Sequence, residues 1–231
     1  MIVMLNNKCN LNKEEFLNYL EDLKTIRTEE DLIVCPSTIN LSMYDNSIFP
    51  LGAQNVSKYI TGPHTGEISS KQLKSYGVKY CIVGHSERRQ EQNESNKDTN
   101  EKIKMLLNEG ITPVLCIGET KEERDNNTYK EVITKEINDA IKDLNEEEQE
   151  SIIVAYEPIY SIGTGIIPTN TEIEEIFKLI KEILPTNKIL YGGSANENNI
   201  DELKQTKEID GYLLGGLSLN ITKLKDFLSK L

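Results

Sequence analysis

One carboxylate near the middle of the chain stands at the end of an apolar run. Glu157 follows the run Ile152–Tyr156 and precedes Pro158–Pro168, an uncharged stretch with two prolines and two glycines. No charged residue returns until Glu172, although 28% of the chain is charged. A carboxylate that loses its water gains proton affinity and can serve as a general base. Glu157 is therefore a candidate for acid–base chemistry; pairing with a lysine or capping a turn is the alternative for a glutamate at a strand end.

Polar residues also follow other apolar runs of the chain. Lys8 comes shortly after the first run, and the sequence Gly-His-Ser-Glu-Arg-Arg at 84–89 follows the fourth. Histidine changes its charge near neutral pH, so His85 is a second candidate for proton transfer. A lone histidine after a strand is more often structural, and a lysine there is more often solvated. A catalytic role for either His85 or Lys8 therefore depends on the residues around it.

Two pairs of glycines follow the seventh and eighth runs. Gly192-Gly193 precedes Ser194, and Gly215-Gly216 follows Leu214. Backbone N–H groups without a neighbouring Cβ can approach an anion closely, and a helix N-terminus adds its dipole. Each pair alone could be a tight turn, but two pairs in successive units favour a phosphate site. The chain contains neither a Walker A sequence nor a GxGxxG fingerprint, so a nucleotide is not indicated.

These residues must be positioned by a regular alternation of short apolar runs and amphipathic segments. Helical periodicity is clearest at 95–108, 129–144 and 171–184, with Asn170 or Thr171 expected to cap the last segment and Gly110 expected to follow the first. Strand-then-helix units predict an α/β fold with a parallel sheet, closed as a barrel or open and doubly wound. Eight units favour a single-domain (β/α)8 TIM barrel over residues 1–231, with function at the carboxyl ends of the strands. The eight runs are 2–5, 32–35, 50–54, 80–83, 112–117, 152–156, 188–191 and 211–214.

Composition limits the classes of partner. The formal net charge is −12, which disfavours nucleic acid and anionic membranes. The start of the chain lacks the features of a signal peptide, and no run approaches the length of a membrane span. The cysteines show no metal-ligand spacing, so we expect neither a metal site nor disulfides, and a reducing cytoplasm fits best. They are Cys9, Cys35, Cys81 and Cys116.

Five short stretches, read together, resemble the triosephosphate isomerase family. They are VGHSERR, CIGET, AYEPIYSIGTG, YGGS and LLGG, and they span nearly the whole chain in this order. The resemblance implies a (β/α)8 barrel, a homodimer, and interconversion of dihydroxyacetone phosphate and glyceraldehyde 3-phosphate without metal or organic cofactor. Two other classes stay open: another phosphate-binding barrel enzyme, and a non-catalytic binding protein on the same fold.

The resemblance also assigns roles to individual residues. It implies that Glu157 is the base, that His85 is a neutral imidazole polarising the substrate oxygens, and that Lys8 faces the developing negative charge. It implies a supporting role for Ser86, Glu87, Cys116, Glu119 and Tyr191. The loop 61–69, with Thr65, Gly66 and Glu67, resembles the segment that enters a second subunit. The implied substrate-binding residues are Asn6, Lys8, Gly163, Ser194, Gly215 and Gly216.

The chain departs from the family pattern in several places, and a shorter segment before YGGS implies a trimmed sixth helix. The usual opening is Asn-Trp-Lys-Met-Asn, whereas Asn7 and Cys9 flank Lys8 here, so the resemblance does not say how Lys8 is held. Tyr160 stands where the family commonly has Trp. At the far end of the uncharged stretch, Ile166-Ile167-Pro168 restricts the backbone, and we expect a stiff hinge.

Overall fold

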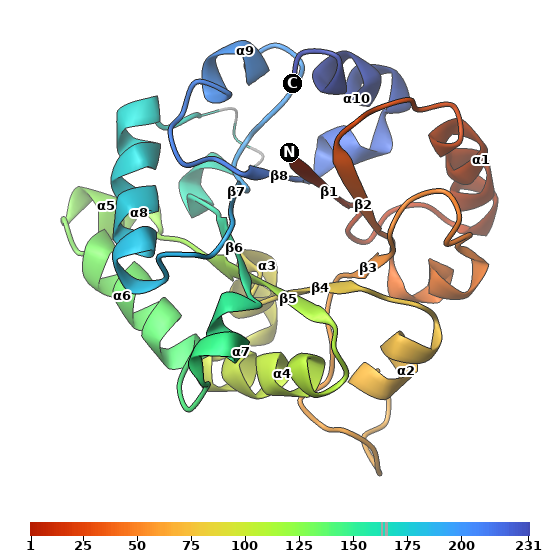
Figure 1. The fold of residues 1–231 in the computed structure, drawn as a ribbon, viewed down its shortest axis with the longest axis horizontal. Coiled ribbons are helices and arrows are strands. Elements are labelled where there is room, and N and C mark those ends of the chain that lie inside the picture. Colours follow the sequence, from red (N-terminus) through yellow and green to blue (C-terminus); the bar gives the residue numbers. More distant parts are fainter. Residues whose placement is uncertain (163, 165) are drawn as a thin grey trace.

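The computed structural model describes residues 1–162, 164 and 166–231, and these form a ring of parallel strands surrounded by helices (Figure 1). The strand order is β2-β1-β8-β7-β6-β5-β4-β3. A parallel bridge between Val34 and Leu51 joins the two ends of this sheet, and Val34 N–H donates to the Pro50 carbonyl at 3.0 Å. The expected closed (β/α)8 barrel is therefore confirmed. Its strands are β1 Ile2–Asn6, β2 Asp31–Cys35, β3 Gly52–Ala53, β4 Tyr80–Val83, β5 Thr112–Ile117, β6 Ile153–Tyr156, β7 Ile189–Tyr191 and β8 Gly211–Leu214.

The third strand is shorter than its apolar run predicts. Pro50 has no N–H to donate to the sheet, and Gln54 lies outside the strand, where its side chain makes other hydrogen bonds. The Gln54 amide donates to the backbone carbonyls of Lys8 and Cys35, at 3.0 and 2.9 Å. The end of β3 thus gives up sheet pairing and supports the loop after β1.

The helices lie on the outside of the ring (Figure 1). Thr169 caps α8, one or two residues earlier than expected, because its hydroxyl accepts the Glu172 N–H while the Glu172 carboxylate accepts the Thr169 N–H. The helix α6 stops before Leu144, and Asp143 has φ 63°, which a continuing helix does not allow. The helices are α1 Lys13–Leu23, α2 Ser70–Ser75, α3 Ser86–Gln92, α4 Asn96–Asn108, α5 Lys121–Asp125, α6 Tyr129–Ala140, α7 Glu146–Glu150, α8 Asn170–Ile183, α9 Ile200–Leu203 and α10 Ile221–Leu228, with 3₁₀ turns η1 Thr38–Met43, η2 Ile159–Ser161 and η3 Gly216–Leu219.

Side chains that alternate along the strands build two buried layers. Met4, Val114 and Leu190 belong to the layer inside the ring, and Leu5, Leu115 and Tyr191 belong to the layer between strands and helices. Burying this apolar area contributes roughly 25 cal/mol per Å². The polar side chains are displaced to the strand ends, where the cavity forms. Among the helices that the structure describes, none is long and apolar enough to cross a membrane.

Candidate active site

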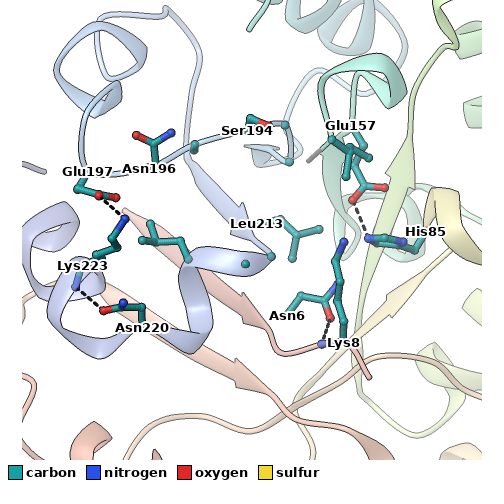
Figure 2. Close-up of a pocket in the computed structure, with 17 residues that line it drawn as sticks. Asn6, Lys8, His85, Glu157, Ser194, Asn196, Glu197, Leu213, Asn220 and Lys223 are labelled. Carbon is teal, nitrogen blue, oxygen red and sulfur yellow. Dashed lines mark hydrogen bonds and ion pairs between the residues drawn. The ribbon is translucent and has the colours of Figure 1, made fainter. Parts of the chain in front are cut away.

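A cavity of about 470 Å³ lies at the carboxyl ends of the strands. It joins residues of β1 and β8 and residues that follow β1, β4, β6, β7 and β8, several of which Figure 2 labels. The candidate acid–base residues and both glycine pairs thus share one space, as the sequence predicts for a barrel. The lining residues are Asn6, Lys8, His85, Glu157, Ile162, Gly192, Gly193, Ser194, Ala195, Asn196, Glu197, Leu213, Gly215, Gly216, Leu217, Asn220 and Lys223.

Glu157 is buried at the end of β6 and points toward His85 (Figure 2). One carboxylate oxygen lies 3.1 Å from His85 Nε2, and the other accepts the Ser86 N–H at 3.4 Å. Two glycines leave room for this residue: a Cβ on Gly192 would lie 2.8 Å from the Glu157 Cγ, and one on Gly118 would lie 1.8 Å from the Glu157 carbonyl oxygen. Burial is the largest influence on Glu157 and raises its pKa, but His85, the Ser86 N–H and Lys8 together outweigh burial and lower the pKa below its ordinary value.

The protonation of His85 follows from its hydrogen bonds. Its Nδ1 accepts the Glu87 N–H at 3.2 Å at the start of α3, so the proton of the neutral ring lies on Nε2 and faces Glu157. A cationic ring would carry protons on both nitrogens and lose the bond from Glu87. Burial acts to lower the pKa of His85, while the touching Glu157 carboxylate raises it above its ordinary value. That raising influence weakens when a ligand separates the two side chains.

Several polar contacts hold Lys8 in an unusual backbone conformation. Lys8 has φ 52°, and its N–H donates to the Asn6 side-chain oxygen at 3.1 Å. Its carbonyl accepts the Gln54 amide, and its ammonium lies 2.6 Å from the Glu87 carboxylate. The pairing places the cation near His85, because Glu87 also supplies the N–H that His85 accepts.

Asn7, where the family commonly has a tryptophan, anchors the Lys8 segment from below. The side chain is buried, and its amide donates to the Ser218 hydroxyl at 3.1 Å and the Tyr19 hydroxyl at 3.3 Å. Hydrogen bonds to η3 and α1 therefore hold this segment, whereas a tryptophan would hold it by apolar packing. Cys9, the second departure, is exposed.

The glycine pairs border the other side of the cavity. A Cβ on Gly193 would lie 2.2 Å from the Tyr191 hydroxyl, and one on Gly215 would lie 3.2 Å from the Lys8 Cε. Ser194 donates from its hydroxyl to the Ser161 carbonyl, and its N–H donates to the Ser161 hydroxyl at 3.3 Å. The loop after β7 is therefore joined to the near end of the uncharged stretch. Gly163, the other expected phosphate contact, lies outside the described residues.

The comparisons with known proteins agree with this geometry. The family model described as triosephosphate isomerase matches residues 1–231. The chain belongs to the triosephosphate isomerase family. A triosephosphate isomerase of Trichormus variabilis is 40% identical over 219 residues, covering 92% of this chain and 90% of that protein. Those of Mycoplasmopsis pulmonis and Idiomarina loihiensis are 41% and 37% identical, covering 81% and 99% of this chain and 77% and 95% of theirs.

The residues expected to support a triosephosphate isomerase site lie around the cavity. Glu119 is buried and does not line it; its carboxylate accepts the Tyr156 hydroxyl at 3.0 Å and lies 3.3 Å from Arg124. Its carbonyl accepts the Ile159 N–H at 3.0 Å, so Glu119 contacts the near end of the uncharged stretch. Cys116 is buried inside the ring, and burial raises the pKa of its thiol well above the ordinary value. These positions fit supporting roles, and the roles stay predictions.

Four polar lining residues were not anticipated: Asn196, Glu197, Asn220 and Lys223. Lys223 pairs with Glu197 at 3.0 Å, and the Asn220 side chain accepts the Lys223 N–H at the start of α10 (Figure 2). An Asn before an amphipathic segment is a helix-cap signal that could have identified Asn220. The ion pair joins the loop after β7 to α10, and no local pattern predicts such a contact.

The loop expected to reach a second triosephosphate isomerase subunit projects from the barrel between β3 and α2, in orange in Figure 1. Thr65, Gly66 and Glu67 are exposed there, and Gly66 has φ 90°. The rings of Tyr59 and His64 stack with centroids 3.6 Å apart and shape the base of the loop. The loop does not line the cavity, and the homodimer stays a proposal.

Proposed function

We infer that the chain is an isomerase that interconverts dihydroxyacetone phosphate and D-glyceraldehyde 3-phosphate through an enediolate, as a step of glycolysis and gluconeogenesis. The relatives named above carry this activity in their names. The observation that supports it most is the contact of 3.1 Å between Glu157 and His85 Nε2, in a cavity that also holds Lys8 and both glycine pairs. A carboxylate, a neutral imidazole and a cation are the groups that this proton transfer needs.

In the proposed reaction the Glu157 carboxylate takes a proton from the carbon next to the substrate carbonyl. The electron pair of that C–H bond forms the C=C bond of the enediolate, and the carbonyl oxygen becomes anionic. His85 Nε2–H donates a hydrogen bond to the substrate oxygens, and Lys8 stabilises the negative charge. The hydroxyl proton on the deprotonated carbon then passes to the former carbonyl oxygen, so that the hydroxyl oxygen becomes the new carbonyl oxygen, and Glu157 returns its proton to the former carbonyl carbon. Atoms and charge balance, so no oxidant or reductant is required.

The glycine side of the cavity is the proposed phosphate site. Backbone N–H groups at Gly215 and Gly216 can approach an anion without a Cβ in the way. Pro158–Pro168 would form the cover over the substrate, with Gly163 as one contact. This segment has no charged residue, so closing it excludes water without burying an unpaired charge.

Two further parts of the proposal concern assembly and location. We expect a homodimer formed through the 61–69 loop, and light scattering at low concentration tests it; a fully active monomer would refute it. A cytoplasmic location fits the four free cysteines of the described residues, and cell fractionation tests it.

The experiment that tests the activity is a coupled assay of the purified chain with glyceraldehyde 3-phosphate, run also in the reverse direction. We expect turnover in both directions without added metal. Thermal-shift measurements with 2-phosphoglycolate run in parallel. Stabilisation without turnover would indicate a binding protein, and neither stabilisation nor turnover would indicate a different substrate.

A further inference from the structure

A largely buried carboxylate behind the catalytic side chains has no part in the reaction proposed above. Glu136 lies on α6, and its side chain is only 12% exposed. One of its oxygens accepts the Gly118 N–H at 2.9 Å, and the other lies 3.7 Å from the Arg89 guanidinium. Buried carboxylates destabilise a fold unless their contacts compensate, so the position of Glu136 calls for an explanation.

The first contact of Glu136 leads to the backbone of Glu157. Gly118 packs so closely beneath Glu157 that a Cβ on it would lie 1.8 Å from the Glu157 carbonyl oxygen. The Glu157 N–H also donates to the Ile117 carbonyl, the residue before Gly118, at 2.8 Å. Holding the Gly118 N–H therefore fixes the turn on which the backbone of Glu157 lies.

The second contact leads to the backbone of His85. Arg89 donates from Nε to the Gly84 carbonyl at 2.6 Å, directly before His85, and from Nη1 to the Asn96 side chain. A gap too narrow for water lies between Arg89, Gly118 and Glu157. Glu136 and Arg89 thus join the backbone segments that carry the two catalytic side chains.

We propose that Glu136 is a positioning residue: it holds the backbone beneath Glu157 and, when its carboxylate is ionised, strengthens Glu157 as a base. The inference rests on the proposed function and deepens it. A second negative charge behind Glu157 raises the proton affinity of Glu157, and the bonds through Gly118 keep its position fixed. The rate of proton transfer to Glu157 should therefore increase when Glu136 loses its proton.

The surroundings of Glu136 place its ionisation in the neutral range. Burial raises the pKa of Glu136 to about 7, against the lowering influence of Arg89 from α3 and of the Gly118 N–H. The negative charges that face it are Glu123 from α5 and Glu157 after β6, and both also raise it. Because Glu157 acts on Glu136, Glu136 acts equally on Glu157.

The kinetic test is the pH dependence of kcat between pH 5.5 and 9. The wild-type kcat should rise about threefold to tenfold as the pH passes through the neutral range. In Glu136→Gln, which keeps an oxygen for the Gly118 N–H but no charge, this rise should vanish, with KM within about twofold of wild type. Glu136→Met, which loses the hydrogen bond too, should lower kcat further. Glu131→Gln makes the same change of charge on an exposed residue of α6 and should keep the wild-type profile.

A rise that persists in Glu136→Gln would overturn the proposal, and so would a loss of kcat that is equal at every pH. A measurement without turnover separates this inference from the proposed function. The carboxyl ¹³C resonance of Glu136 should titrate near pH 7 and should titrate at lower pH in Glu157→Gln, because that change removes a facing negative charge. An unchanged midpoint would contradict the coupling.

Discussion

The two sides of the cavity differ in how they are built. On one side, Lys8, His85 and Glu157 are ionisable side chains, and polar contacts to neighbouring loops hold each of them. On the other side, the glycine pairs after β7 and β8 present backbone without side chains, and Ser194 joins the loop after β7 to Ser161. Proton transfer requires charged groups in fixed positions, whereas a phosphate requires N–H groups that can be approached. Substitutions on the first side should lower kcat, and those on the second should raise KM.

His85→Gln gives a large expected effect on the first side. Its amide can still donate a hydrogen bond, but the N–H that faces Glu157 is no longer fixed by the bond from Glu87 to Nδ1. We expect kcat to fall by about 10²–10³-fold with KM within about threefold. Steady-state kinetics measures this, with binding of 2-phosphoglycolate as the control for folding. A rise in KM at unchanged kcat would place His85 on the binding side instead.

Gly193→Ala and Gly216→Ala form a matched pair on the second side. A Cβ on Gly193 would clash with the Tyr191 hydroxyl at 2.2 Å, whereas a Cβ on Gly216 meets no atom within 4 Å. The first change should therefore raise KM about tenfold by moving the loop after β7, and the second should raise it far less. KM values from the isomerisation assay decide this. Equal increases in KM for the two variants would show that the close packing of Gly193 against Tyr191 does not determine the phosphate site.

The stability of the first side should depend on pH through Glu136. Its pKa is about 7 in the folded protein, above the ordinary value of 4.5, so the folded state binds the proton more tightly. The stabilisation is complete below the unfolded pKa and is lost as the pH rises through 7. Glu136→Gln should therefore raise the melting temperature at pH 8 relative to wild type, by about 3–6 °C more than at pH 5. Calorimetry of both proteins at pH 5 and pH 8 tests this prediction. An equal difference in melting temperature at the two pH values would refute it.

Pro168→Ala is expected to give the smallest effect, at the far hinge of the cover. Pro168 fixes its own φ and restricts Ile167, and both isoleucines before it are stiff. Relaxing the hinge should change kcat and KM together by about twofold and alter the dependence of kcat on viscosity. If all three stayed unchanged, Pro168 would only precede the cap of α8.

The sequence predicted the barrel and the main residues of the cavity because these depend on local patterns. Each apolar run marks a strand, and the residue after each run must lie at the shared carboxyl edge, as Glu157 and His85 do. The limits lie in contacts between distant segments. The amide of Gln54 on Lys8, and the pair of Lys223 with Glu197, depend on loops that only the closed ring brings together.

Burial of polar groups was equally hard to foresee. Asn7 and Glu136 appear in the sequence as ordinary surface residues, yet Asn7 is buried beneath Lys8 and Glu136 is only 12% exposed. The helical pattern of α6 places Glu136 near its apolar face, since Ile133 and Ile137 are buried beside it in the sequence. The helical pattern does not predict the hydrogen bond that Glu136 accepts from the Gly118 N–H, in the loop after β5. Glu119 was expected to support the site rather than act as a base; it lies outside the cavity lining, and its role stays a prediction.

The most direct test of the whole account is Glu157→Gln, because this change removes the proton acceptor and almost no volume. We expect turnover of glyceraldehyde 3-phosphate to fall by about 10³-fold or more, while 2-phosphoglycolate still raises the melting temperature, since the phosphate side is untouched. Turnover within a few-fold of wild type would contradict the assignment of Glu157 as the base.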